Sequence, residues 1–597
     1  MSHKETERRN PLLYLFGKTW HHSAGNRRNV ALYWTCFVIA VSLTLFTQPL
    51  IGAKIMNVIQ VNGITQESFK TLLKLLSLMF VIDFVFWVFH GPARVLEVIN
   101  AFKARANYRK HLLKGIMTLP MEWHVEHHSG DTIDKVEKGS GALFHFSRDS
   151  FEIVYSLVQL VGSFAMLAYF SPSSMYIVGT MMCISVWITI RFDSVMIPQY
   201  KELNKSENQI SENVFDTISN IATVIILRVE KLVFTAISNR VDKPFLLFKR
   251  NTVLSETKWF LTSMCTSVMT ALVMGTYFWQ HLNTPKGILV GTVYILNKYL
   301  DEVGSIFFRF TSMYSDVVVQ KTRLMNAEEL AEEFRPESFT NHVMPADWQR
   351  LEIRGLNFSY HLETESMHLL DVSLTFSKGE RIALVGESGS GKTTLLKVMR
   401  DLYHPKSLQL LVDGREIRDG FSGISRAIAL VPQNPEIFST SIRENITLGA
   451  DHDDEFVRHY TDIACFTDVV EGLPKKFESS IKEKGVNLSG GQQQRLALAR
   501  GLLACHDKDI ILLDEPTSSL DTGTEMKVYE NIFQEFQGKT IVSSIHRLHL
   551  LPLFDQIYFF KDGRIVASGN LTELIAKCPE FQELWLQYMQ HSEEVVV

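Results

Sequence analysis

Residues 386–394 read Gly386-Glu387-Ser388-Gly389-Ser390-Gly391-Lys392-Thr393-Thr394, between an apolar strand-like run and a helical pattern. Glycines in such a turn let backbone N–H groups point at an anion, and the following helix N-terminus adds its positive dipole end. Lys392 is placed to reach the β- and γ-phosphates of a nucleotide, and the Thr393 hydroxyl can ligate Mg²⁺. The stretch therefore predicts a phosphate-binding P-loop in an α/β domain, rather than a chance glycine-rich turn.

Composition divides the 597-residue chain into two unlike halves. The chain is 46% hydrophobic and 21% charged, but long apolar runs fill the part before about residue 320 and charges dominate afterwards. The formal net charge of -5 argues against nucleic acid as the main partner. The cysteines show no CxxC or Cys/His metal spacing, so we expect them to be reduced packing residues.

The first half carries six stretches that can cross a hydrocarbon core of about 30 Å at the rise of an α-helix. They lie at roughly residues 30–58, 70–96, 151–170, 173–192, 258–280 and 286–314, after an expected interfacial helix over 10–20. The connections 97–150 and 193–257 carry eight Lys or Arg residues each, whereas the short connections near 60–69 and 171–174 carry none. By the positive-inside rule, the N-terminus and both long connections are cytoplasmic.

The two long connections have helical patterns and would extend about 40 Å beyond the membrane. Their tips, near residues 119–131 and 212–228, are therefore candidates for contact with a soluble domain. The first tip holds His124, His127 and His128, which suggest a metal site. We favour a turn between helices, because Pro, Ser, Gly and Asp surround the histidines. The polar segment 326–350 is expected to be a linker with a short helix.

From residue 351 onwards, short β-rich runs and then alternating strands and helices predict an α/β domain. Tyr360 ends an early strand ahead of the P-loop and could stack on an adenine ring. Residues 509–516 form an apolar strand that ends in Asp514 and Glu515. If this strand lies parallel beside the P-loop strand, Asp514 provides a second protein group for a Mg²⁺ held by Thr393. Glu515 would then face the γ-phosphate and could polarise the attacking water.

A second motif carries a family resemblance. Residues 488–501 read Leu488-Ser489-Gly490-Gly491-Gln492 followed by QQRLALARG, which resembles the signature segment of ATP-binding cassette (ABC) proteins. Together with the six predicted spans, the chain resembles an exporter-type half-transporter over about residues 10–590. Ser519 stands where the family usually has Ala and Thr393 where it usually has Ser, and neither change removes a needed group.

The resemblance implies roles for further residues. Gln433 is the Q-loop residue that touches Mg²⁺ and the membrane domain, and Glu483 is the X-loop contact. Asp521, in the D-loop of residues 518–521, and the switch histidine His546 complete the motif set. The expected catalytic residues are Glu515, His546 and Lys392, and the expected metal ligands are Thr393, Gln433 and Asp514. The expected nucleotide contacts are Tyr360, Gly386, Glu387, Ser388, Gly389, Ser390, Gly391, Lys392, Thr393, Thr394, Gln433, Ser489, Gly490, Gly491 and Gln492.

These observations predict a membrane α-helical domain of six transmembrane helices with long cytoplasmic extensions, fused to an α/β P-loop ATPase domain. The expected boundaries are 1–325 for the transmembrane domain, 326–350 for the linker and 351–597 for the nucleotide-binding domain. In the resembled family, ATP lies between the P-loop of one cassette and the signature of another. A chain with one of each needs a second subunit, and the intact motifs favour a homodimer over a heterodimer.

The expected function is ATP-driven export or flipping of an amphipathic substrate, such as a lipid, drug-like molecule or peptide, by an alternating-access dimer with ATP and Mg²⁺. Import on the same frame and an ATP-gated channel or regulator remain alternatives. We expect no peptidase domain ahead of residue 1, which would disfavour a leader-cleaving peptide exporter. We expect a bacterial inner membrane, with the nucleotide-binding domain in the cytoplasm.

The sixth predicted span carries charges that a lipid-facing helix would not tolerate cheaply. At spacings of three or four residues they form one polar stripe, and Asp83 lies at similar depth in the second span. We expect this stripe to line the substrate path, although Lys298 and Glu302 could simply pair along their own helix. The stripe consists of Lys298, Asp301, Glu302, Ser305 and Arg309.

Overall fold

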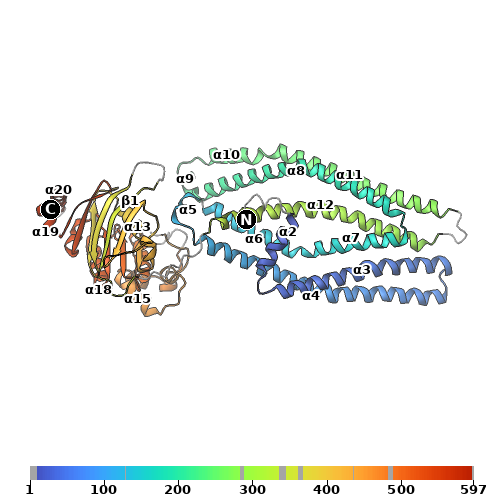
Figure 1. Cartoon of the computed structure of the whole chain (residues 1–597), viewed down its shortest axis with the longest axis horizontal. Coiled ribbons are helices and arrows are strands. Elements are labelled where there is room, and N and C mark those ends of the chain that lie inside the picture. The colour runs from blue at the N-terminus through green and yellow to red at the C-terminus, as the bar shows by residue number, and fades with distance from the viewer. Residues whose placement is uncertain are drawn as a thin grey trace. The chain divides into compact units, whose positions relative to one another are not determined.

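A computed structural model describes residues 10–127, 129–282, 288–334, 344–360, 367–433, 436–481 and 488–594. The chain divides into two compact units (Figure 1). The first comprises residues 1–119 and 127–336, and the second comprises residues 120–126 and 337–597. The short helix α5 (Met121–Glu126), at the first predicted tip, therefore groups with the second unit rather than with the helices on either side of it.

The first unit is helical throughout its described elements. It contains six helices of 21 residues or more (α3, α4, α7, α8, α11 and α12). All of these except α7 extend clearly beyond the spans expected from the sequence. The helices are α2 (Pro11–His22), α3 (Arg27–Asn62), α4 (Gln66–Ile116), α6 (Ser129–Arg148), α7 (Ser150–Phe170), α8 (Ser174–Ser219), α9 (Ile221–Ile226), α10 (Glu230–Asp242), α11 (Phe245–Gln280) and α12 (Val290–Glu332).

Local sequence explains where these helices begin and end. Gly63 ends α3 at φ +60, and Thr65 then caps α4, its hydroxyl accepting from the backbone N–H of Ser68. The Ser68 hydroxyl contacts the backbone N–H of Thr65 at 2.7 Å, which completes a reciprocal capping box. The short connection between the first two spans is therefore explained by a C-cap at Gly63 and an N-cap at Thr65.

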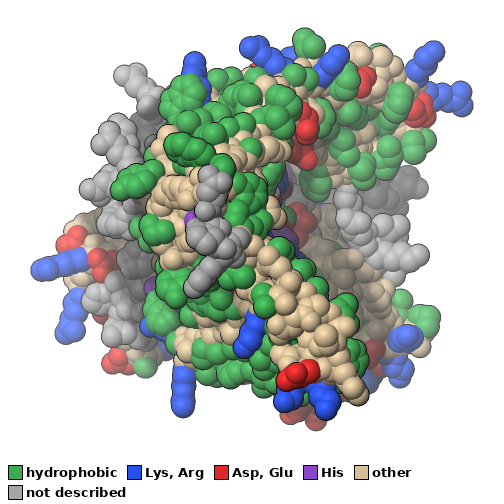
Figure 2. Space-filling model, turned by 90° about the vertical axis from the view of Figure 1, so that its right-hand side faces the viewer, with side chains coloured by type: hydrophobic (Ala, Val, Ile, Leu, Met, Phe, Trp, Pro, Cys, Tyr) green, Lys and Arg blue, Asp and Glu red, His purple; other side chains and the backbone are tan. Residues whose placement is uncertain are grey.

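Five stretches of helix are long and apolar enough to cross a membrane, among the residues that the structure describes. They lie in α3, α4, α7, α8 and the stretch Glu230–Gln280. Many of their large apolar side chains are exposed, as lipid-facing side chains are, and Figure 2 shows hydrophobic side chains spread over the face that it draws. The sixth predicted span, in α12, falls outside this set because its charged stripe lowers its apolar content, yet α12 packs against α3, α7 and α11.

A buried ion pair joins two long helices. Lys258 of α11 lies 3.0 Å from Asp193 of α8, and both side chains are almost fully buried. A buried charge is tolerated only when it is paired, so this contact fixes how α8 and α11 align. Local sequence patterns do not reveal this pair, because the two residues are 65 positions apart.

The second unit contains two sheets. One is a four-stranded sheet in the order β2-β1-β4-β5, with β1 (Arg350–Phe358), β2 (Leu369–Ser377), β4 (Ser407–Val412) and β5 (Arg415–Glu416). The other is a six-stranded sheet in the order β10-β9-β3-β8-β7-β6. Its strands are β3 (Arg381–Gly386), β6 (Ile428–Val431), β7 (Ile510–Asp514), β8 (Thr540–Ser544), β9 (Gln556–Lys561) and β10 (Arg564–Gly569).

The six-stranded sheet corrects one expectation. The strand that carries Asp514, β7, was expected directly beside the P-loop strand β3, but β8 lies between them and pairs in parallel with both. The chain leaves β7 through α18 (Thr522–Glu535) and inserts β8 in the gap. Asp514 still faces the P-loop, because the helix after the loop, α13 (Lys392–Met399), packs across β3, β7 and β6.

The helices around this sheet are α14 (Ile442–Thr447), α15 (Asp454–Ile463), α16 (Thr467–Glu471), α17 (Gly490–Ala504), α18, α19 (Leu571–Lys577) and α20 (Pro579–Glu594). β7 and β8 are buried along their whole length, so the core of the unit lies on both faces of this sheet. The linker expected at 326–350 begins inside α12, which continues to Glu332.

Candidate functional site

The P-loop joins β3 to α13 as the sequence predicts. Gly386 and Gly391 have φ of +155 and +106, a region that favours glycine. A Cβ at Gly386 would clash with the backbone carbonyl of Phe560, so this position has no room for a side chain. α13 starts at Lys392 with Gly391 as its N-cap, which leaves the first N–H groups of the helix for an anion.

Lys392 folds back over this loop. Its Nζ donates to the carbonyls of Gly386 and Glu387 at 2.7 and 3.0 Å, and the residue is only 4% exposed. Burial lowers the pKa of the Lys392 ammonium, while Glu515 and Asp514 act in the opposite direction. No carboxylate of the described residues forms an ion pair with this buried ammonium, an arrangement that favours binding of a phosphate group.

Asp514 and Thr393 meet across the site. The Thr393 Oγ1 donates a hydrogen bond of 2.8 Å to Asp514 Oδ1, and Asp514 is 3% exposed at the end of β7. Burial raises the pKa of Asp514, and the Thr393 hydrogen bond opposes this rise. The sequence-predicted pair of oxygen ligands is therefore brought into direct contact.

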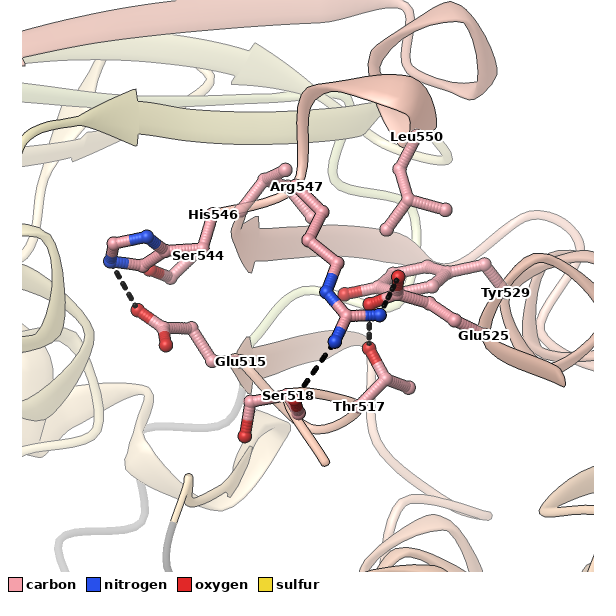
Figure 3. A pocket seen from close by; sticks show the side chains of 10 residues that line it. Glu515, Thr517, Ser518, Glu525, Tyr529, Ser544, His546, Arg547 and Leu550 are labelled. Atoms are coloured by element: carbon pink, nitrogen blue, oxygen red, sulfur yellow. Dashed lines mark hydrogen bonds and ion pairs between the residues drawn. The ribbon is translucent and has the colours of Figure 1, made fainter. Parts of the chain in front are cut away.

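The carboxylate of Glu515 is contacted by side chains from two other segments of the chain. The Gln433 Nε2 donates to one carboxylate oxygen at 2.7 Å, and the His546 Nε2 lies 3.4 Å from the other (Figure 3). Glu515 itself has φ +45, a conformation that non-glycine residues adopt rarely and that clusters at functional sites. Side chains that follow β6 and β8 thus converge on the carboxylate that follows β7.

The signature segment begins a different helix. Ser489 caps α17, its hydroxyl accepting from the N–H of Gln492, while the Gln492 side chain accepts from the N–H of Ser489. Gly490 and Gly491 form the first turn of α17, so their N–H groups belong to a helix N-terminus. α17 packs against α14, α15 and β6, whereas the P-loop helix α13 packs against β3, β6 and β7.

Gln494 of α17 was missed by the sequence analysis. Its Nε2 donates to the Ser518 hydroxyl at 3.0 Å, and its Oε1 accepts from the Ser519 N–H at 2.8 Å. The signature helix is therefore tied to the D-loop within the same chain. Its place just after Leu488–Gln492 was visible in the sequence. No spacing rule, however, predicts that a residue there contacts the D-loop.

Tyr360 lies in a cluster of rings. Its hydroxyl donates to Thr394 Oγ1 at 3.3 Å. Phe358, His368 and Tyr403 all lie edge-on to it, with ring centroids 4.9 to 5.0 Å away. Tyr403 was also missed, because it follows α13 rather than adjoining Tyr360 in sequence. Of the other predicted residues, Glu483 lies outside the described residues.

The polar stripe of α12 contacts neighbouring helices. Lys298 lies 3.1 Å from Glu302 on its own helix, and Gln159 of α7 donates to the Glu302 carboxylate and, at 3.0 Å, to the Ser305 hydroxyl. Asp83 accepts a hydrogen bond from Gln48 of α3. The stripe residues of α12 that this network joins therefore face α7, and Asp83 belongs to a separate contact.

Arg309, lower in the same stripe, lines a cavity of about 310 Å³ and lies 4.4 Å from the centre of the Tyr155 ring. The cavity combines apolar and charged side chains. It is lined by Phe146, Asp149, Glu152, Ile153, Arg309, Met313, Asp316, Val317 and Gln320.

Both units match known protein families. Residues 31–298 match the model of the ABC transporter transmembrane region, and residues 369–518 match the ABC transporter model. The β-(1→2)glucan export ATP-binding/permease protein NdvA of Nitrobacter winogradskyi is 30% identical, over 82% of this chain and 81% of its own length. The chain belongs to the ABC transporter family. Its resemblance to an exporter-type half-transporter is thereby confirmed.

Two further comparisons support the ABC exporter architecture. The mitochondrial iron-sulfur clusters transporter ATM1 of Candida glabrata is 27% identical over 82% of this chain and 69% of its own length. A solved structure of a bacterial Atm1-family ABC exporter with ATP bound shares the fold with a TM-score of 0.82, at 20% identity, over 94% of this chain and 99% of its own. This ABC transporter is thus an integral membrane protein that binds and hydrolyses ATP for export.

Proposed function

We propose that this ABC transporter works as a homodimer that hydrolyses Mg²⁺-bound ATP to export or flip an amphipathic substrate across a bacterial inner membrane. The observation that carries the hydrolytic part is the convergence of Gln433 and His546 on Glu515, beside the Thr393–Asp514 pair. In this proposal Glu515 is the general base that takes a proton from the attacking water. His546 contacts the γ-phosphate, and Lys392 stabilises the β- and γ-phosphates.

The nucleotide would bind through backbone N–H groups more than through side chains. The P-loop residues 386–394 and the free N–H groups at the start of α13 would hold the phosphates, and Tyr360 would stack on the adenine. The edge-on rings around Tyr360 support this role, because they restrict its rotation. Ser489, Gly490, Gly491 and Gln492 would contact the phosphates of a nucleotide held by the other chain.

The donor set fits Mg²⁺. Thr393, Asp514 and Gln433 can all offer oxygen atoms, which Mg²⁺ prefers over nitrogen or sulfur. Asp514 is buried, and a buried carboxylate is stabilised by a cation. When bound with ATP, Mg²⁺ would supply positive charge against the phosphate oxygens. Thr393 and Asp514 would hold it, and their hydrogen bond keeps both side chains in place beforehand.

Two identical chains are proposed because each chain carries one P-loop and one signature, on separate helices. A site made from the P-loop of one chain and the signature of another would be complete in a homodimer. Lys392, Asp514, Glu515, His546 and Ser489 are all present, so neither of the two sites would lack a group.

The lining of the membrane half supports the proposed substrate class. The cavity next to Arg309 joins apolar side chains to three carboxylates and one guanidinium, and the stripe above it adds Lys298 and Glu302. Charged groups in a membrane domain face the bundle interior or a watery cavity, because lipid exposure is costly. A cargo with a polar or charged head and an apolar body would match both kinds of lining.

The test is an ATPase-stimulation screen of the protein in lipid nanodiscs. Matched sets of compounds are compared: an amphiphile, its water-soluble head and its apolar body alone, drawn from lipids, peptides and drug-like molecules. We expect an intact amphiphile to raise turnover where neither part does. Equal stimulation by a soluble head alone would contradict the proposed substrate class, while the hydrolytic proposal would still stand.

A further inference from the structure

A buried carboxylate lies behind the hydrolytic site. Glu525 of α18 is only 3% exposed, four residues after the D-loop residue Asp521 that caps this helix. The Thr517 hydroxyl donates to its Oε1 at 2.6 Å. Its Oε2 lies 3.2 Å from Arg547 Nη1 and 3.3 Å from His549 Nε2. A carboxylate this buried is stable only with such partners.

Arg547 connects this carboxylate to the D-loop. The same Nη1 donates to the Leu520 carbonyl at 2.7 Å, and Nη2 donates to the Ser518 carbonyl at 3.2 Å. The guanidinium therefore joins Glu525 and two D-loop carbonyls, as Figure 3 shows in part. Because guanidinium donors have a fixed planar arrangement, these three contacts define its position closely.

The two partners Thr517 and Arg547 belong to the segments that carry the proposed hydrolytic side chains. Thr517 comes two residues after Glu515, and Arg547 directly follows His546. One cavity of about 300 Å³ is lined by all four of these residues, together with Glu525 and Ser518 (Figure 3). A shift of Glu525 would therefore displace Glu515 through Thr517, and His546 through Arg547.

We propose that Glu525 is a positioning residue for ATP hydrolysis, which acts through Thr517 and Arg547 to fix His546 and the D-loop relative to Glu515. This proposal rests on the hydrolytic roles proposed above for Glu515 and His546. This network restricts movement of Glu525, because a local shift would leave its buried carboxylate without hydrogen-bond partners. Glu525 holds the geometry of the site without touching the nucleotide.

The first test variants change the network with little change in volume. Glu525→Gln keeps an acceptor for Thr517 but removes the charge opposite Arg547. Arg547→Lys keeps the charge but loses the planar fork that reaches both D-loop carbonyls. Glu530→Gln, at an exposed position on the same helix, is the matched control. Each protein is studied as the full chain in nanodiscs, with steady-state ATPase kinetics and binding of a labelled ATP analogue.

We expect Glu525→Gln and Arg547→Lys each to lower kcat by about tenfold or more, the effect of losing a charge-assisted hydrogen bond. The KM for ATP and the affinity for the analogue should stay within about twofold of the parent protein. The double variant should be no slower than the slower single variant, because the two residues act as one unit. Glu530→Gln should match the parent protein.

Two results would overturn the inference. One is an unchanged kcat in Arg547→Lys, which decides the matter even if Glu525→Gln fails to fold. The other is a parallel loss of nucleotide affinity and kcat, which indicates general damage to the domain. His546→Ala, measured alongside, separates this inference from the proposed function. A slow His546→Ala with a normal Arg547→Lys contradicts only the inference, whereas a normal His546→Ala contradicts the role of the histidine itself.

Discussion

The side chain of Gln433 donates a hydrogen bond of 2.7 Å to Glu515, the carboxylate that we propose as the general base. Gln433 follows β6 and Glu515 follows β7, and these strands are parallel neighbours in the sheet. Their carboxyl ends therefore meet at one edge, which is where the P-loop also lies. The contact links the segment expected to reach the membrane domain to the group expected to activate water.

The first prediction concerns this carboxylate. Glu515→Gln keeps the size of the side chain and its hydrogen bonding but cannot accept a proton. We expect ATP binding to remain and hydrolysis to fall by about 10²–10⁴-fold, the usual contribution of a general base. Phosphate release and retention of labelled ATP measure the two steps. Turnover equal to that of the parent protein would exclude Glu515 as the base.

The second prediction concerns the number of equivalent sites. Two copies with different tags are co-expressed, one of them with Lys392→Ala, and the mixed dimer is purified through both tags. Because one of the two composite sites then lacks its P-loop lysine, the mixed dimer should lose at least about half of its activity. Full activity in the mixed dimer, or purification only with a different subunit, would contradict the homodimer.

The third prediction concerns the buried pair between α8 and α11. Lys258→Met leaves Asp193 buried without its partner, a change worth about 3–5 kcal/mol of destabilisation. The double change Asp193→Leu and Lys258→Met should recover most of the loss, since no unpaired charge remains. Thermal unfolding in detergent measures both, with exposed Lys249→Met on the same helix as the control. A Lys258→Met protein as stable as the control would show that the pair does not hold these helices.

The fourth prediction concerns the substrate path. Asp83→Asn and Lys298→Met remove single charges from the membrane half while the ATPase unit is unchanged. We expect basal hydrolysis to remain and stimulation by cargo to be lost. Unchanged transport in both variants would reduce the stripe to a structural feature, in which Lys298 simply pairs with Glu302.

The fifth prediction is a pH dependence at the N-terminal helix. Burial, and then the neighbours His21, His111 and Lys18, lower the pKa of His22 from its ordinary value of 6.5 to about 3. Because the unfolded chain takes up this proton first, stability from neutral His22 is present above about pH 6.5 and is lost as the pH falls towards the folded pKa.

A His22→Gln protein stays neutral at this position, so its melting temperature should fall less than that of the parent between about pH 7.5 and about pH 5. The exposed His124→Gln should behave like the parent. If the melting temperature fell equally in the parent and in His22→Gln, His22 would not be the source of the pH dependence.

The sequence predicted those parts of the site that lie within single motifs. The P-loop, Asp514 with Glu515, and Ser489 at a helix start were all recognisable, because the chemistry requires these residue types at short spacings. The family and the two-part fold followed from the same motifs. The order of strands was not predictable in this way. β8 lies between β3 and β7 because of a long-range crossover, which local patterns do not encode.

The contacts that the sequence did not predict are those between distant segments. Glu525 was indistinguishable from other acidic residues on a helix, since only packing makes it buried. The Lys258–Asp193 pair and the Gln494 bridge to the D-loop depend equally on tertiary structure. The sixth span was marked by its polar stripe, and the same charges lower the apolar content by which spans are recognised.

Transport by proteoliposomes with outward-facing ATPase domains tests the central claim most directly. ATP is added outside together with a labelled amphiphile found by the stimulation screen. We predict that the parent protein accumulates the label in the lumen or inner leaflet, and that Glu515→Gln does not. In matched vesicles preloaded with the label, ATP-dependent loss of the label from the lumen would indicate import, and equal movement with Glu515→Gln would indicate a channel. Either result would contradict ATP-driven export.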